Sequence, residues 1–168
     1  MLHKEITMQI RKARVNDSSA VSKILLKAFL PFRAFYTKQA FNATIISAET
    51  VVQRMTEGEV FLATYNERPI GTVSVLFKED GCNLKGMAVL PEAQGMKVGY
   101  NLLRLVEDVA LDNGMKRLYL CTTPFLLSAI HLYKRFGFDK IGDHFYDFFG
   151  TQIFSMEKLL KNPGYESH

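Results

Sequence analysis

Residues 84–114 have the sequence LKGMAVLPEAQGMKVGYNLLRLVEDVALDNG, which contains the clearest strand and helix patterns of the chain. Its first part, Leu84–Leu90, is short, mostly apolar and followed by a proline, which is typical of a buried strand. Apolar residues then recur at helical spacing until Asn113-Gly114, a pair that favours the end of a helix. Two glycines lie between these patterns. The stretch therefore predicts a strand, a tight turn and a helix, in that order.

The sequence after this helix predicts a second strand in the same sheet. Arg117–Cys121 has the composition of a strand. A strand, a helix and a strand in succession form a right-handed crossover, which makes the two strands parallel. Leu126–Phe136 predicts another helix, because its apolar residues share one face and Gly137 follows as a C-cap.

The flanking sequence predicts further strands and two more helices. Before residue 84 we expect a strand within residues 8–14, a helix from Asn16-Asp17-Ser18 to about Phe29, a helix from Ser47, and a hairpin of Val60–Tyr65 and Ile70–Phe77 around Asn66-Glu67-Arg68-Pro69. After Gly137 we expect strands at about Lys140–Phe145 and Thr151–Lys158. This order predicts an α+β fold with a mixed, mostly antiparallel central sheet and helices on both faces. We expect residues 1–168 to form a single domain with a loose tail from about residue 162.

The composition excludes several classes of protein. The 168 residues are 48% hydrophobic and 23% charged, which favours a globular domain over a disordered chain. No apolar run exceeds four residues, whereas a membrane-spanning helix needs about 20, so we expect no membrane partner. Residues 1–10 lack the apolar stretch of a secretory signal, and we expect a cytoplasmic location. Two cysteines without CxxC or HExxH spacing predict no metal site.

The net charge of +4 at pH 7 is unevenly distributed. Residues 1–46 hold eight basic and two acidic side chains, whereas the rest of the chain holds 13 and 15. The basic residues are spread along the segment, which favours a solvated face over a nucleic-acid site. We therefore expect no nucleic-acid partner. A basic nucleic-acid binder ranks third, behind the two functions described below.

Residues 94–99, QGMKVG, form the turn before the predicted helix. A helix that begins here presents unpaired backbone N–H groups and the positive end of its dipole, which suits a phosphate or pyrophosphate. A glycine turn of this kind is as often only a tight connection between a strand and a helix. The six residues alone leave both interpretations open.

Two longer stretches carry a family resemblance. Residues 87–103, MAVLPEAQGMKVGYNLL, resemble the acetyl-CoA signature of the GNAT superfamily of N-acetyltransferases, and residues 129–138, AIHLYKRFGF, resemble that family's second signature. The order of elements is similar to the family's over about residues 8–158. The resemblance implies the GNAT fold and an acyltransferase that transfers an acetyl group from acetyl-CoA to a primary amine, directly, in a ternary complex.

The resemblance also implies where acetyl-CoA binds. Its pantetheine arm is expected along Met87, Ala88 and Val89, bonded like an added strand, with a backbone N–H there to stabilise the tetrahedral oxygen. Its pyrophosphate is expected on the amides of Gln94, Gly95, Met96, Lys97, Val98, Gly99 and Tyr100. Two residues depart from the family pattern. Lys97 replaces a glycine, so it adopts a conformation that glycine tolerates better or the turn is altered, and Leu126, expected at the cofactor, replaces a frequent asparagine.

Tyr133 is the catalytic residue that the resemblance implies, as the acid for the leaving thiolate. From the residues alone a core aromatic is favoured, because Tyr133 shares a helix face with Leu126 and Ile130. No motif assigns a general base. Cys82 and Cys121 are expected to be buried small residues, since no histidine or helix start activates either one, and this favours direct transfer.

Two aromatic segments indicate the acceptor site. One lies between the first two predicted helices and the other between the last two strands; they contain Phe29, Phe32, Phe35, Tyr36 and Phe41, and Phe145, Tyr146, Phe148 and Phe149. In the GNAT fold both segments border the acceptor site, so Phe32, Tyr36 and Tyr146 are expected to bind a small-molecule amine or a peptide amine. A lid on the core or a homodimer contact fits the same residues. The alternative function is a catalytically silent acyl-CoA-binding module.

Overall fold

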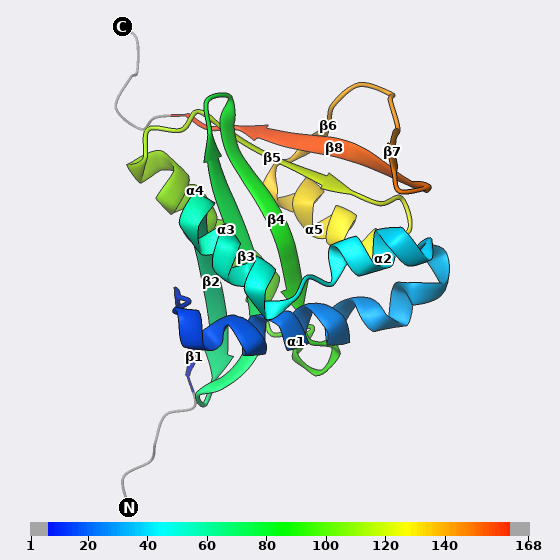
Figure 1. The fold of residues 1–168 in the computed structure, drawn as a ribbon. Coiled ribbons are helices and arrows are strands. Elements are labelled where there is room, and N and C mark those ends of the chain that lie inside the picture. Colours follow the sequence, from blue (N-terminus) through cyan, green and yellow to red (C-terminus); the bar gives the residue numbers. More distant parts are fainter. Residues whose placement is uncertain (1–6, 162–168) are drawn as a thin grey trace, which may run out of the picture.

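One eight-stranded sheet runs through the computed structural model, which describes residues 7–161 (Figure 1). Its strands are β1 (Met8–Lys12), β2 (Gly58–Tyr65), β3 (Arg68–Lys78), β4 (Gly81–Val89), β5 (Arg117–Thr122), β6 (Asp139–Lys140), β7 (Tyr146–Phe148) and β8 (Thr151–Leu159). The order is β1-β2-β3-β4-β5-β8-β6, and β7 pairs with β8. Only β4 and β5 are parallel neighbours within the described residues, so the expected mixed, mostly antiparallel sheet is confirmed.

Helices cover both faces of this sheet. They are α1 (Ser18–Phe29), α2 (Lys38–Thr44), α3 (Ala48–Glu57), α4 (Val98–Asp112) and α5 (Leu127–Phe136). Figure 1 shows α1 and α3 in front of the sheet and α4 and α5 behind it. The predicted apolar stripe of α4 is buried against the sheet, with Leu102, Leu103 and Val106 fully enclosed. Each such side chain contributes about 1.5–3 kcal/mol by leaving water, and this burial fixes the start of α4 beside β4.

The hairpin of β2 and β3 turns on two residues rather than four. Asn66 and Glu67 both have positive φ, 50° and 66°, and Tyr65 pairs with Arg68 across the turn. Two central residues with positive φ match the twist of antiparallel strands. Arg68 and Pro69, which were expected in the turn, therefore belong to β3.

The segment between α1 and α3 contains helical structure that the sequence pattern does not predict. α1 ends at Phe29 as expected, and a 3-10 helix with Pro31 in its first turn continues to Phe35. α2 follows, and the Thr37 hydroxyl accepts a hydrogen bond from the Ala40 amide at its start. α2 has only seven residues, so its apolar positions do not complete a helical repeat.

The strand expected at Lys140–Phe145 is wrong for most of its length. Only Asp139 and Lys140 pair with β8, and Gly142 then turns the chain with a φ of 60°. Phe145 packs edge-on against Phe154, with ring centroids 6.2 Å apart, without joining a strand. The short strand β7 comes one residue later. The expected tail from about residue 162 lies outside the described residues.

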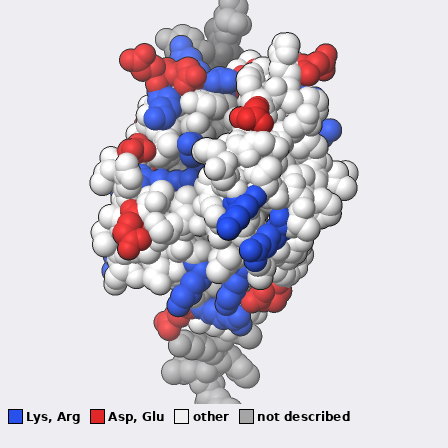
Figure 2. Space-filling view, turned by 45° about the vertical axis from the view of Figure 1, so that its right-hand side comes forward, with Lys and Arg blue, Asp and Glu red and all other residues white. Residues whose placement is uncertain are grey.

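The basic N-terminal segment forms one side of the molecule. The sequence contains no acidic residue between positions 18 and 48, where Lys23, Lys27, Arg33 and Lys38 lie on or beside α1 and α2. Figure 2 brings this side forward and shows basic side chains gathered in the centre and lower part of the face. No helix within residues 7–161 is both long enough and apolar enough to span a membrane.

Candidate functional site

The strands β4 and β5 separate soon after they meet. Their parallel pairing joins Cys82 with Leu118 and Asn83 with Tyr119, and no later pair connects them within the described residues. β4 remains paired with β3 as far as Val89. The stretch from Leu84 to Val89 therefore presents one strand edge without a strand partner; Figure 1 shows β4 and β5 diverging there, and we call the space between them the opening.

A bulge in β4 lies at this opening. Lys85 pairs with Ser74 and Ala88 with Thr72, so Gly86 and Met87 together face the single residue Val73. A bulge of this kind bends the strand and changes its twist, which turns β4 away from β5. The φ of Gly86 is 56°, a conformation that a residue with a Cβ rarely adopts.

The turn before α4 leaves several backbone amides unpaired. The amides of Gln94 and Met96 bond to carbonyls three residues earlier. The amides of Gly95 and of residues 97–100 find no acceptor within residues 7–161. The turn thus carries free N–H groups at Gly95 and residues 97–100 and the positive dipole end of α4, whereas the amides of Gln94 and Met96, which were also expected to be free, are already paired.

Lys97 adopts the conformation that glycine tolerates better. Its φ and ψ are 59° and 25°, which places it in the left-handed region at the N-cap of α4. The turn therefore keeps the geometry of a glycine while it carries an exposed ammonium group.

Gly99 has an unpaired backbone amide, and its lack of a side chain also allows two neighbouring side chains to pack closely against it. A Cβ at this position would lie 2.7 Å from Cδ2 of Leu132 and 3.1 Å from Cε of Met87. The first turn of α4 is thereby held against both α5 and β4. The free amides consequently lie beside the unpaired edge of β4.

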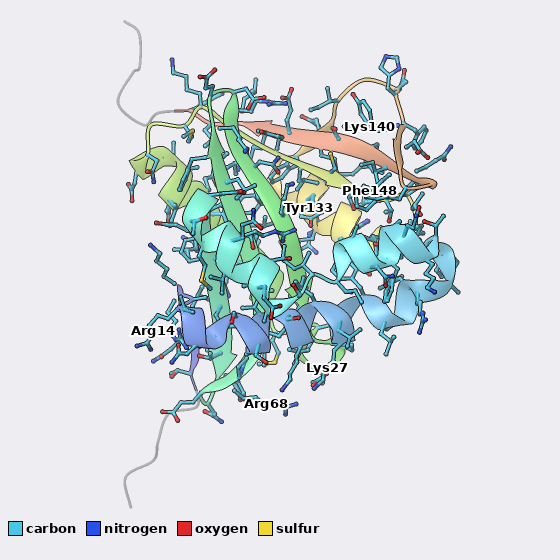
Figure 3. All side chains as sticks on the ribbon, in the orientation of Figure 1. Arg14, Lys27, Arg68, Tyr133, Lys140 and Phe148 are labelled. Atoms are coloured by element: carbon cyan, nitrogen blue, oxygen red, sulfur yellow. The ribbon has the colours of Figure 1, made fainter. Side chains whose placement is uncertain are left out.

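Tyr133 projects from α5 toward the same opening. Figure 3 shows it between the diverging ends of β4 and β5. Its side chain is 7% exposed and its ring packs on Phe138, with centroids 5.7 Å apart. Burial raises the pKa of the Tyr133 phenol to about 12, and the nearby Tyr36 adds to the effect.

The Tyr133 hydroxyl has no hydrogen-bond partner among residues 7–161. The fully enclosed side-chain polar atoms without a partner in this region are Nη1 of Arg54 and Oγ1 of Thr123. The hydroxyl of Tyr133 is not among them, so it retains accessible surface from which it can donate to a bound molecule.

α5 begins without a polar cap. Leu126 is the N-cap residue and has no side-chain hydrogen bond to the helix. A hollow of about 360 Å³ lies along the exposed side of α5, lined by Leu127, Ser128, His131, Leu132 and Arg135. Leu132 also packs against Gly99 in the first turn of α4, so this hollow adjoins the start of α4.

The first of the two aromatic segments packs around Phe125, a residue that the sequence pattern did not single out. Its ring stacks with Phe32 and Phe35, at 6.5 and 5.4 Å, and is met edge-on by Tyr36 at 4.8 Å. Burial raises the pKa of Tyr36 to about 12. Phe125 lies two residues before the start of α5. No local sequence signal points to it, because its partners come from a distant segment.

Thr37 joins the two aromatic segments. Its hydroxyl donates to the Phe149 carbonyl at 2.6 Å, and its amide donates to Oγ1 of Thr151 at 3.0 Å. An open hollow of about 420 Å³ lies between the segments, lined by Phe35, Thr37, Pro124, Phe125, Gly150, Thr151 and Gln152. Phe32 and Tyr36 thus belong to one cluster, whereas Tyr146 is 51% exposed in β7 and makes no ring contact with it.

The two cysteines differ in environment. Cys82 is buried as expected, and burial raises the pKa of its thiol to about 11. Cys121 is exposed, which contradicts the expectation of a buried residue. The alternation along β5 places it on the face opposite to the buried Leu118 and Leu120, 3.4 Å from Oγ of Ser155. No group of three or more His, Cys, Asp or Glu side chains within residues 7–161 is placed to hold a metal ion.

Comparison with known sequences gives one family match and several relatives. The profile described as the acetyltransferase (GNAT) family matches residues 21–138. The uncharacterized N-acetyltransferase YobR of Bacillus subtilis is 30% identical over 99 residues, which are 57% of this chain and 39% of that protein. N-acetyltransferase 8B of Homo sapiens is 27% identical over 146 residues, 79% of this chain and 64% of that protein. The chain spans less than two thirds of the length of these curated relatives.

Solved structures show the same fold. The PaiA N-acetyltransferase of Thermoplasma acidophilum, in complex with coenzyme A, aligns with a TM-score of 0.80 at 18% identity, covering 92% of this chain and 100% of that one. The ribosomal-protein-S18-alanine N-acetyltransferase of Escherichia coli aligns with a TM-score of 0.74 at 20% identity, covering 96% and 99%.

The left-handed conformation of Lys97 is unfavourable for a residue with a Cβ and should lower the stability of the protein. Lys97→Gly should raise the free energy of unfolding by about 1 kcal/mol, because glycine adopts this conformation without a Cβ clash. The melting temperature should rise by about 2–4 °C, as expected for a chain of this size. Lys97→Ala is the matched control, since it removes the ammonium group but keeps the Cβ. Equal stability of the two variants in urea and thermal unfolding would contradict a strained turn.

Proposed function

Because the chain belongs to the acetyltransferase (GNAT) family, we propose that it transfers an acetyl group from acetyl-CoA to a primary amine of a small molecule or a peptide. One observation carries this proposal most directly. The unpaired edge of β4 and the free amides at the start of α4 lie side by side, so one extended molecule with an amide-rich arm and phosphates can contact both.

The residues present fit acetyl-CoA in chemistry. In the proposed complex, backbone groups of Met87, Ala88 and Val89 bond the pantetheine arm, and the amides near Lys97 hold the pyrophosphate. The Lys97 ammonium adds a positive charge at the phosphates, while Leu126 offers an apolar contact at the start of α5. The hollow beside His131 and Arg135 is the proposed place of the remaining phosphate, because a guanidinium binds phosphate well.

All bonds and protons of the proposed reaction are accounted for by the amine and acetyl-CoA. The neutral amine attacks the thioester carbonyl carbon, so that a C–N bond forms and the C–S bond breaks. The nitrogen loses one proton and the departing thiolate gains one. A backbone N–H at the free edge of β4, among residues 87–89, donates to the carbonyl oxygen as negative charge develops on it.

Tyr133 acts in this proposal as a hydrogen-bond donor to the leaving sulfur. Its pKa of about 12 lies well above that of a free thiol, about 8.5, so complete proton transfer from the phenol to the thiolate is unfavourable. A hydrogen bond from the phenol O–H to the negatively charged sulfur still stabilises the thiolate as it leaves. The free hydroxyl of Tyr133 supports this role.

The aromatic cluster is the proposed wall of the acceptor site. Phe32 and Tyr36 contact Phe125, which leads directly into the helix that carries Tyr133. Tyr36 also lies close enough to Tyr133 to influence its pKa. The amine therefore reaches the reacting centre along an aromatic surface. Tyr146 lies outside the cluster and is proposed to touch only the outer part of a larger acceptor.

Acetyl-CoA binding is the first test. Acetyl-CoA at 100 times its Kd should stabilise the protein by about 2.7 kcal/mol, measured as a rise in melting temperature. Lys97→Glu should reduce this rise strongly, because a carboxylate then faces the phosphates. Lys116→Glu, at an exposed position between α4 and β5, should leave it unchanged.

Release of free thiol from acetyl-CoA across a panel of amines then separates the possible functions. The proposed enzyme releases thiol with at least one amine. A stabilised protein that releases none would be a silent acyl-CoA-binding module, and a protein that acetyl-CoA does not stabilise would contradict both functions.

Tyr133→Phe should lower kcat by about 10- to 100-fold, which corresponds to the loss of one hydrogen bond to a charged group, about 1.5–3 kcal/mol, with little change in the affinity for acetyl-CoA. Because the raised pKa keeps the phenol protonated far above neutrality, the ratio of wild-type to variant rates should be constant from pH 6 to pH 9. A ratio that falls within this range would show that Tyr133 titrates there and would contradict the assigned role.

Phe35→Ala should raise KM for the acceptor by about 2- to 10-fold, which corresponds to the loss of one aromatic contact. The KM for acetyl-CoA should not change. Val15→Ala is the matched control, because Val15 and Phe35 are both 64% exposed and Val15 lies outside the cluster. Equal kinetics of the two variants would remove the cluster from the acceptor site.

A further inference from the structure

The open hollow of about 420 Å³ between the two aromatic segments is lined by neutral residues. Two of its seven lining residues are phenylalanines and one is a proline, and none of the seven carries a charge. Arg33 and Lys38, the basic residues nearest to this lining in the chain, are not part of it, and the guanidinium of Arg33 lies over the Phe41 ring, 5.7 Å from its centre. The lining therefore offers no ion pair to a second charged group on the acceptor.

Phe35 and Phe125 give the hollow an aromatic surface. Their ring centroids lie 5.4 Å apart and the rings are 26° from parallel, yet Phe35 remains 64% exposed. Aromatic rings favour offset-stacked and edge-to-face contacts, which contribute more than the buried apolar area alone. A ring that binds in the hollow can therefore extend this stack and cover Phe35.

The hydroxyl groups in the hollow are already engaged in hydrogen bonds. The Thr37 hydroxyl donates to the Phe149 carbonyl at 2.6 Å and accepts from the Ala40 amide at 3.1 Å, and the Thr151 hydroxyl accepts from the Thr37 amide. Gln152 is exposed, and its carboxamide makes no hydrogen bond with another residue in the described part of the chain. The lining side chains thus offer one free neutral polar group, whereas a peptide backbone would bring several groups that need partners.

The hollow shares a wall with the proposed reacting centre. Phe125 lines the hollow and is met edge-on by Tyr36, with ring centroids 4.8 Å apart. Tyr36 also lies close enough to Tyr133 to add to the effect of burial on the pKa of that phenol. A molecule with its ring in the hollow can therefore direct an amine along this wall toward Tyr133.

We propose that the acceptor is a primary amine joined by a short alkyl chain to an uncharged aromatic ring, and that this ring stacks on Phe35 in the hollow. This inference rests on the proposed acetyl transfer and names its substrate class. A volume of about 420 Å³ lies toward the lower end of the range of small-molecule sites, about 300–1,000 Å³, which suits a single ring. Gln152 faces the ring in this arrangement and determines which ring substituents and charges the site accepts.

Matched acceptors test the substrate class, with thiol release from acetyl-CoA as the readout. The set consists of 2-phenylethylamine, its saturated analogue 2-cyclohexylethylamine, phenylalanine, 1,5-diaminopentane and a tripeptide with an N-terminal phenylalanine. The kcat/KM for 2-phenylethylamine should be at least tenfold above that for the amino acid, the diamine and the tripeptide, and about 2- to 10-fold above that for the saturated amine. Phe35→Ala should abolish the difference between the aromatic and the saturated amine.

Charge substitutions at Gln152 test its role in specificity. Gln152→Glu should raise kcat/KM for the diamine relative to 2-phenylethylamine by about 2- to 5-fold, the worth of an exposed ion pair, and Gln152→Lys should do the same for phenylalanine. Gln9→Glu is the matched control, because Gln9 is also exposed but lies in β1, at the other end of the strand order from β8. It should leave all preferences unchanged.

The outcomes separate this inference from acetyl transfer itself. A wild-type preference for the diamine, the amino acid, the tripeptide or the saturated amine would overturn the proposed class and leave acetyl transfer standing. Equal responses to Gln152→Glu and Gln9→Glu would also contradict it.

Calorimetric titration with 2-phenylethylamine measures binding without the reaction. Both with and without coenzyme A, which has no acetyl group to transfer, Phe35→Ala should raise the Kd by about 2- to 10-fold. If no amine releases thiol, acetyl transfer fails, and this titration still decides whether the hollow binds an aromatic amine. Absence of binding in both conditions, or an equal Kd for the wild type and Phe35→Ala, would overturn the proposal.

Discussion

The candidate site exists because β4 separates from β5. β4 pairs along its length with β3 but shares only two residue pairs with β5. A strand in the interior of a sheet that loses its neighbour exposes backbone donors and acceptors, which is unfavourable unless another molecule binds them. The bulge at Gly86 and Met87 turns the strand, and the packing of Gly99 on Leu132 and Met87 brings the start of α4 to the same place.

One strained residue and several unpaired polar groups lie around this opening. Lys97 adopts a left-handed conformation, the amides behind it lack acceptors, and Arg54 and Thr123 have enclosed polar atoms without partners. Elsewhere in the described chain the core is formed by apolar side chains that are almost fully buried. Proteins tolerate local departures from good packing where function requires them, so these groups support the proposal that acetyl-CoA binds at the opening.

The sequence predicts those parts of the structure that depend on local pattern. The strand, turn and helix of residues 84–114 follow from periodicity and glycine placement, and the conflict at Lys97 is visible because a lysine stands where the family has a glycine. The opening itself depends on which strands pair and where pairing stops, and no local pattern carries that information. Phe125 was missed for the same reason, because its place in the aromatic cluster comes from contacts with a distant segment. The strand expected at Lys140–Phe145 is not formed beyond Lys140, because Gly142 turns the chain with a positive φ.

Hydrogen–deuterium exchange with and without acetyl-CoA tests the central claim, that the edge of β4 and the start of α4 form one binding surface. Acetyl-CoA should slow exchange in peptides that cover residues 84–90 and 94–101, while the hairpin of β2 and β3 around Asn66 should exchange at the same rate in both states. Unchanged exchange in both peptides at saturating acetyl-CoA, or protection confined to another part of the chain, would contradict the account.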